Sequence, residues 1–434
     1  MGYRQLLAVF LTLAVTGKAF AKFEAHEWGT FTSLVGSNGL TQHGMYHEDE
    51  ALPDFVHGFG EILSESSPLP PPADRPCRPH SKLCFSLETL NSNPITQKME
   101  TPVIYFYSDR QQEVEVNVKF PLGVITETYP APIRTFPRTE GRLENGDTTF
   151  RVSVTGSRYD KLPYVDPTNI YAHARNVVEA SSVRAGSFDN PEVEKFIFYR
   201  GLGRFQPRLQ ISSTGDSLTF RAPNDARPQA AFLVYSDGEG KVRTYDVGSF
   251  GTFPMIDIEA DTIRYLKTGV FQGFGRPRLL NSQETRAALI GSLKTAGLTD
   301  DEAVAMINTW EHGYLGVRGL RLLYILPRNE VEATLPLSIS PAPEKLERVF
   351  IGRLEIMTEA DEIRVFDRVM NEGQLGFDVS SLGRFAHPTL IRTKQAYIER
   401  QARTGTTIDQ KIIHIFDTLI EKASIGIVDG GVVR

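Results

Sequence analysis

Histidines are concentrated near the start of this chain. Five of the nine lie within the first 80 residues, at positions 26, 43, 47, 57 and 80. Four of these share one polar, glycine-containing run with the carboxylates of Glu27, Glu48 and Asp49. Imidazole and carboxylate groups at this density suit a divalent metal such as zinc, or an acid/base pair. The run therefore predicts a metal-dependent or acid/base site.

A hairpin would bring the metal-ligating side chains together. Residues 36–39 read Gly-Ser-Asn-Gly, a strong turn signal, and the chain can be a strand on either side of it. If Val35 pairs with Leu40, His26 faces Asp49 at about 5 Å between Cβ atoms, and His47 lies on the diagonal at about 7–8 Å. We therefore expect His26, His47 and Asp49 to be ligands, while a slip of one residue would put His26 and His47 on opposite faces.

The same pairing assigns the remaining residues of the run. Glu27 or Glu48 is the expected catalytic base, Trp28 faces His47, and His43 is a further candidate ligand that lies farther along the strand. Two alternatives stay open. A helix over 41–50 would place His43 and His47 one turn apart, although Gly44 disfavours it. A solvated hairpin whose imidazoles make ordinary hydrogen bonds needs no metal at all.

The first residues predict export. Met1–Ala21 has an early cation, a short apolar run and the small-residue exit Ala19-Phe20-Ala21, which is the pattern of a secretory signal peptide. We expect the mature chain to start at Lys22, in the periplasm or outside the cell, and no later stretch is long and apolar enough to span a membrane. Removal of the signal changes the formal net charge from −6 to −8 because Arg4 and Lys18 are lost. Nucleic acid and anionic lipid are therefore not expected partners.

The two cysteines, Cys77 and Cys84, flank a short loop next to a proline-rich segment. In an oxidising compartment this spacing predicts a disulfide, and it is not a spacing typical of zinc ligands.

An aromatic and arginine-rich segment at 198–205 gives a second candidate site. Arg200 and Arg204, together with Trp28, are candidate ligand-binding residues, because guanidinium and aromatic groups can hold carboxylates or stack on sugar rings. The alternative is that these residues only close the edge of a sheet.

The hydrophobic period changes along the chain. Two-residue alternation between turns dominates from 101 to 260, with expected strands at 101–108, 114–120, 149–154, 195–199, 217–222 and 231–235. After residue 261 we expect helices at 282–296, from 299 to about 310, from 358, at 388–403 and at 407–423, and strands at 320–326 and 348–357. This predicts an α+β fold, an antiparallel β-sandwich core with C-terminal helices packed against it. The expected divisions are 1–21, 22–100, 101–260 and 261–434.

Five segments carry a resemblance. They are HEWGTFTS (26–33), KMETPVIYFYS (98–108), FIFYRGLGRF (196–205), GLRLLYILPR (319–328) and RVFIGRLEI (348–356). Together they resemble a family of exported bacterial proteins typified by the HEWGTF segment. The resemblance implies export and a single integrated unit, and it carries no chemistry. The residues leave three function classes: a metal-dependent hydrolase of an envelope or extracellular polymer, a non-catalytic binder of glycan or protein, and a structural envelope protein.

Overall fold

The computed structural model describes residues 22–45, 47, 52–58, 92–136, 143–156, 161–187, 189–273 and 275–426. Several predicted features lie outside these ranges: the export signal, Glu48, Asp49, and the cysteine pair Cys77 and Cys84. The described chain mixes helices with several mostly antiparallel sheets, which confirms the α+β class.

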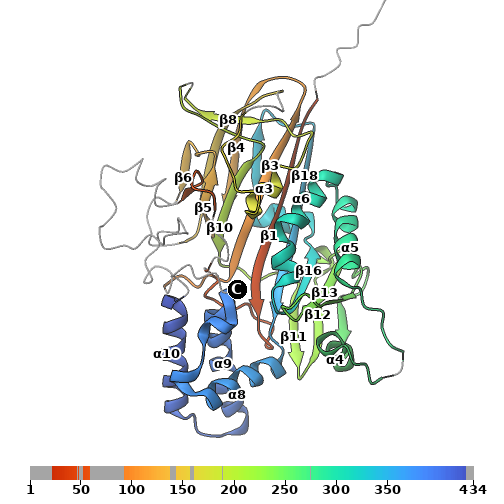
Figure 1. Cartoon of the computed structure of the whole chain (residues 1–434), viewed down its shortest axis with the longest axis vertical. Coiled ribbons are helices and arrows are strands. Elements are labelled where there is room, and N and C mark those ends of the chain that lie inside the picture. Colours follow the sequence, from red (N-terminus) through yellow and green to blue (C-terminus); the bar gives the residue numbers. More distant parts are fainter. Residues whose placement is uncertain are drawn as a thin grey trace, which may run out of the picture.

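A large sheet, here sheet A, forms the centre of the molecule (Figure 1). Its strands, in spatial order, are β14 (Val242–Asp246), β13 (Ala231–Ser236), β16 (Gly319–Ile325), β18 (Lys345–Ile356), β1 (Phe23–Val35), β3 (Gln97–Ser108), β10 (Ile197–Gly203), β5 (Gly123–Tyr129) and β2 (His57–Gly58). Neighbouring strands are antiparallel except β1 and β18, which run parallel. Sheet A therefore combines strands from the first hundred residues with strands from the last hundred or so.

Two smaller sheets share a hydrophobic core with one face of sheet A. Sheet B has the order β17 (Leu337–Ser340), β4 (Gln112–Phe120), β7 (Gly146–Val154), β8 (Val183–Gly186) and β9 (Pro191–Glu194), with β6 (Arg134–Phe136) beside β7. Sheet C has β11 (Gln210–Thr214), β12 (Ser217–Arg221) and β15 (Met255–Ile258). The alternation predicted for β4 is confirmed, because Val114, Val116 and Val118 are buried in one cluster with Phe31 and Ile104 of sheet A.

Helices cover the other face of sheet A. They are α3 (Ile170–Ala174), α5 (Ser282–Thr295), α6 (Asp300–Glu311) and the π-helical turn η2 (His312–Gly316), while α4 (Ala260–Thr268) lies beside sheet C (Figure 1). The predicted capping box of α6 is present, with Thr299 and Glu302 bonded to each other's backbone N–H. Leu293, Met306 and Trp310 of the helices pack on Trp28 and Tyr105 of the sheet.

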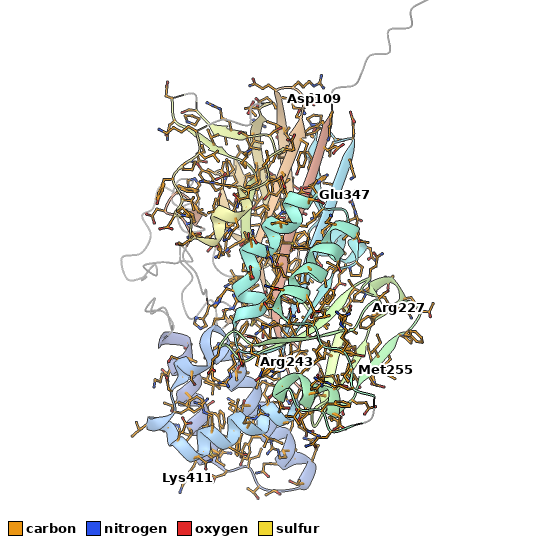
Figure 2. All side chains as sticks on the ribbon, turned by 45° about the vertical axis from the view of Figure 1, so that its right-hand side comes forward. Asp109, Arg227, Arg243, Met255, Glu347 and Lys411 are labelled. Carbon is orange, nitrogen blue, oxygen red and sulfur yellow. The ribbon has the colours of Figure 1, made fainter. Side chains whose placement is uncertain are left out.

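The C-terminal helices lie at one end of sheet A (Figure 1). They are α8 (Glu359–Gly376), η3 (Val379–Phe385), α9 (Ala386–Thr404) and α10 (Gln410–Gly426), and the shorter α7 (Arg328–Thr334) and η1 (Asn224–Ala226) precede them in the chain. Figure 2 shows the long axis of the molecule, with Asp109 after β3 at one end and Lys411 of α10 at the other. Within the described ranges, no helix combines the length and the apolar character that a membrane crossing requires.

The hairpin predicted for the histidine run is wrong. The turn at residues 36–39 forms, but the returning chain makes only a bridge between Val35 and Thr41, one residue away from the predicted register. Both edges of β1 are already occupied, by β18 on one side and β3 on the other. The central position of β1 in sheet A therefore leaves no free edge at His26 for a returning strand.

The expected divisions of the chain cut through single elements. The one after residue 100 falls inside β3, and the one after residue 260 falls at the first residue of α4. Each of the three mature divisions contributes strands to sheet A.

Candidate functional site

His26 lies on the face of β1 that packs against the helices. Its Nδ1 is 3.0 Å from both carboxylate oxygens of Glu302 at the start of α6, and Tyr107 donates to the same carboxylate at 2.7 Å. Burial would raise the pKa of Glu302, but bonds from His26, Thr299 and Tyr107 hold it below its usual range. Within the part of the chain that the structure describes, His26 Nε2 makes no hydrogen bond, and it lies 4.0 Å from Glu24. A carboxylate thus orients this imidazole and leaves its second nitrogen open.

Glu27 lies on the opposite face of β1, so it is not beside His26 as a catalytic base would be. It is fully buried, accepts from Tyr199, and pairs with Arg348, whose Nε is 2.5 Å from its carboxylate. These neighbours make Glu27 part of a core ion pair.

His43 and His47 follow the turn after β1. The ring of His43 lies 6.5 Å from that of His387 on α9, and the backbone carbonyl of His47 accepts from Lys98 at 2.6 Å. Because Lys98 is opposite Thr32 on β1, His47 is anchored six residues from His26 along the strand, roughly 20 Å at about 3.3 Å per residue. The structure therefore does not bring these two predicted ligands together by strand pairing.

The described residues do not build the predicted metal site. Among them, no group of three or more His, Cys, Asp or Glu side chains is arranged to hold a metal ion. Asp49 and Glu48 fall outside the described ranges, so the metal assignment stays a prediction.

The aromatic and arginine-rich residues have different surroundings from those predicted. Arg200 belongs to a buried strand of sheet A, not to a loop, and its register partner on β5 is Glu127. Trp28 is fully buried in the core beneath the helices, beside Tyr105. Arg204 is half exposed and pairs with Glu144 at 2.8 Å. These three side chains do not form a single surface.

A set of buried charges crosses the helix-facing side of sheet A, and the sequence did not predict it. We call it the arginine layer; its members are Lys98 and Glu100 of β3, Arg321 of β16, Arg353 and Glu355 of β18, and Arg384 of η3. Each is less than 9% exposed. The strand register explains their assembly, because residues paired across neighbouring strands share a face. Arg321 pairs with Glu355, and Thr32 lies between Arg353 and Lys98.

Glu100 is the acceptor at one end of the arginine layer. It accepts from Arg384 at 2.5 Å and from Thr32, and Lys98 Nζ lies 3.8 Å away. Burial alone would raise its pKa, but Arg384, Lys98 and Arg353 hold the pKa far below the usual range of a carboxyl group. These cations therefore favour the ionised form of Glu100.

Glu355 is the acceptor at the other end. One of its oxygens accepts from Arg321 Nε and from Arg353 Nε, each at 2.8 Å, and also lies 2.7 Å from Arg353 Nη2. Arg321 also donates from Nη1 to the backbone carbonyl of Tyr314 and from Nη2 to that of Val317. Two fully buried guanidinium groups thus share a single carboxylate, so this trio carries one positive charge in excess.

Arg353 is a fully buried member of the layer whose guanidinium is only partly hydrogen-bonded. Among the described residues its Nη1 has no hydrogen-bond acceptor, and it lies against Gly313, where an added Cβ would come within 2.8 Å of it. Its guanidinium faces the ring of Phe385 at 5.5 Å, and Arg384 faces the same ring at 4.9 Å. Burial, and repulsion from Arg384 and Arg321, lower the pKa of Arg353 despite its pair with Glu355. A buried donor without an acceptor, among like charges, is the arrangement that an anion would stabilise.

Charged residues inside otherwise apolar strands were the signal that could have revealed this layer. Lys98 and Glu100 precede the apolar run of β3, Arg321 interrupts β16, and Arg353 and Glu355 stand two apart in β18. Charges are rarely buried unless they are paired, so a charge on the inward face of a central strand implies a partner across the sheet. The five segments that carry the family resemblance all contribute to this face of the sheet or to the strands beside it.

A comparison with protein-family models and with curated proteins found no match to this chain.

Proposed function

We propose that this protein binds an oxyanion group, a carboxylate, phosphate or sulfate borne by a ligand, through the arginine layer. The observation that carries the proposal is Arg353, which is fully buried, shares its carboxylate with Arg321, and has a donor with no acceptor among the described residues. An anion near Nη1 would supply that acceptor and offset the excess charge. Guanidinium groups suit such ligands because their planar donors match the geometry of oxyanions.

Ion-dependent stabilisation of the mature protein tests this function. We expect phosphate, sulfate or acetate to raise the melting temperature over chloride at constant ionic strength, because a ligand at 100 times its dissociation constant stabilises by about 2.7 kcal/mol. Arg353→Gln should abolish that increment, and Arg353→Lys should reduce it. The matched control is Arg151→Gln, which removes an exposed arginine of sheet B. The proposal fails if none of the three ions stabilises the wild type beyond chloride, or if Arg353→Gln keeps the increment.

The alternative proposal is the metal-dependent hydrolase predicted from the sequence. It is favoured by His26, because a carboxylate on one ring nitrogen and an open second nitrogen are typical of a histidine that binds a metal or transfers a proton. The remaining ligands would include residues outside the described ranges, such as Asp49. Zinc content per chain in the wild type, in His26→Asn and in the exposed control His414→Asn tests it, with loss expected only for His26→Asn. Equal zinc in all three, or none in any, would reject the proposal.

We further infer that the protein is exported, and that sheets A and B stack as a β-sandwich. The sequence of Met1–Ala21 supports export, as does the resemblance to the HEWGTF family. The core cluster that joins Val116 and Phe150 of sheet B to Phe31 and Ile104 of sheet A supports the sandwich. N-terminal sequencing of exported material should find Lys22, and a start at Met1 would contradict export.

A further inference from the structure

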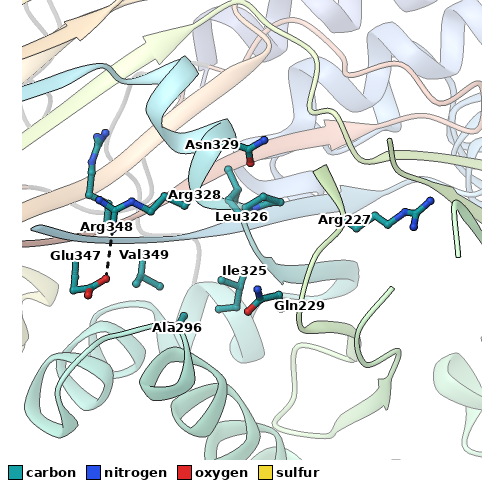
Figure 3. A pocket seen from close by; sticks show the side chains of 11 residues that line it. Arg227, Gln229, Ala296, Ile325, Leu326, Arg328, Asn329, Glu347, Arg348 and Val349 are labelled. Atoms are coloured by element: carbon teal, nitrogen blue, oxygen red, sulfur yellow. Dashed lines mark hydrogen bonds and ion pairs between the residues drawn. The ribbon is translucent and has the colours of Figure 1, made fainter. Parts of the chain in front are cut away.

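A cavity of about 330 Å³ lies where β16 ends and the chain turns into α7 (Figure 3). Polar groups on its wall come from Gln229, Arg328, Asn329 and Glu347, and apolar groups come from residues such as Ile325 and Val349. It is separate from the arginine layer, whose residues do not line it. An apolar wall with a few polar groups is typical of a site for a small ligand.

The cavity borders an unpaired stretch of the edge of β18. The ladder between β16 and β18 ends at Ile325 and Ile351, followed by one further bond from Leu326 N–H to the Phe350 carbonyl. Backbone groups alternate in direction along a strand, so the N–H and C=O of Arg348 point to the same side as those of Phe350. In the described part of the chain, no hydrogen bond uses either of these Arg348 groups on that side. The cavity wall thus offers one backbone donor and one backbone acceptor.

Arg328 places a cation beside this edge. Its Nη1 is 3.5 Å from Glu347 (Figure 3). Its Nε bonds Glu332 at 2.8 Å, and its Nη2 has no hydrogen bond among the described residues. The 3.5 Å contact is long for a hydrogen bond, so a ligand carboxylate can replace it. Arg328 is the first residue of α7, and both Arg328 and Arg348 line the cavity, so the guanidinium and the open backbone groups border the same space.

We propose that this cavity binds the C-terminal residue of a peptide. The terminal carboxylate accepts from Arg328, the last amide of the peptide bonds the open backbone groups of Arg348, and the last side chain packs on Ile325 and Val349. Adding an extended peptide to a free strand edge and capturing its carboxylate are two modes of peptide recognition that reinforce each other. The site is a second one, independent of the oxyanion site at Arg353.

Binding of capped dialanines to the mature protein tests this site. Acetyl-Ala-Ala with a free carboxylate should bind, measured by saturation-transfer NMR and calorimetry. Its C-terminal amide should bind at least tenfold more weakly, and so should the analogue methylated on the last amide nitrogen. Arg328→Gln should also lose at least tenfold. Because Arg328 is 44% exposed, we expect that variant to fold.

Two controls separate this proposal from the oxyanion site. Arg151→Gln, a loss of an exposed arginine elsewhere, should keep full affinity for acetyl-Ala-Ala. Arg353→Gln should also keep it, since Arg353 is not on the cavity wall. The proposal is overturned if the wild type binds no acetyl-Ala-Ala, if the free acid and the amide bind equally, or if Arg328→Gln binds as well as the wild type.

Discussion

At the scale of single residues, the most consequential side chain of the arginine layer is Glu100. Arg384 and Lys98 both lie within 4 Å of its carboxylate, and all three side chains are buried. We expect Glu100→Gln to lower the free energy of unfolding by about 3–5 kcal/mol, because buried cations would lose their counter-charge. Urea denaturation measures this loss. The matched control is Glu115→Gln on the outer face of β4, where the pair between the exposed side chains of Glu115 and Arg151 should contribute under about 1 kcal/mol. Equal losses of unfolding free energy from the two changes would show that the buried cations do not need the charge of Glu100.

His387 gives the protein an acid-sensitive position. Burial, with the nearby His43, lowers its pKa to about 4. An unfolded histidine titrates near 6.5, so between about pH 6.5 and 4 the unfolded chain binds a proton that the native chain does not. Stability therefore falls as the pH falls through this window, by up to about 3 kcal/mol.

Replacing His387 should weaken the dependence of stability on pH. We expect His387→Gln to show a smaller difference between its urea midpoints at pH 7.5 and 4.5 than the wild type shows, whatever its own stability. His414→Asn on the exposed side of α10 should keep the wild-type difference. An unchanged difference in His387→Gln would mean that another group causes the acid sensitivity.

At the scale of elements, the start of α6 ties the helix layer to β1. Thr299 accepts from the Glu302 N–H, and Glu302 bonds both the Thr299 N–H and His26. Thr299→Ala should cost about 1 kcal/mol of unfolding free energy, the usual contribution of an N-cap. The control is Thr404→Ala in the last turn of α9, where the hydroxyl caps no N-terminus and a smaller loss is expected. A loss from Thr299→Ala no greater than that of the control would contradict the capping role.

Elements with local signals could be predicted from the sequence, and their pairing could not. Capping residues before α6 and α8 set the starts of those helices, and two-residue alternation identified β4. The partner of β1 was missed because β18 begins more than 300 residues later, and nothing near residue 26 encodes that distance. The hairpin prediction used a correct turn but assumed that a strand pairs with the next segment of the chain. The candidate site was missed for the same reason, since each strand supplies only one or two charges.

At the scale of the whole molecule, sheet A depends on both ends of the chain. β1 is held on one side by β18 and on the other by β3, and β18 also supports β16. α10 contributes Phe416, Leu419 and Ala423 to a separate cluster among the C-terminal helices. Within the last ninety residues, β18 is therefore central to the sheet, whereas α10 packs in a cluster apart from it.

Two truncations separate the contribution of β18 to stability from that of α10. A mature chain ending at Gly405 lacks α10 and should keep the sheet signal in far-ultraviolet circular dichroism, with a lower melting temperature, because only the C-terminal helix cluster loses packing. A chain ending at residue 344 lacks β18, so β1 and β16 each lose a neighbour on a buried edge. We expect that chain to aggregate or to melt without a cooperative transition, since unpaired buried strands carry unsatisfied backbone groups. Cooperative unfolding of the shorter chain would show that β1 and β16 do not need β18. It would contradict the inference that sheet A depends on both ends of the chain.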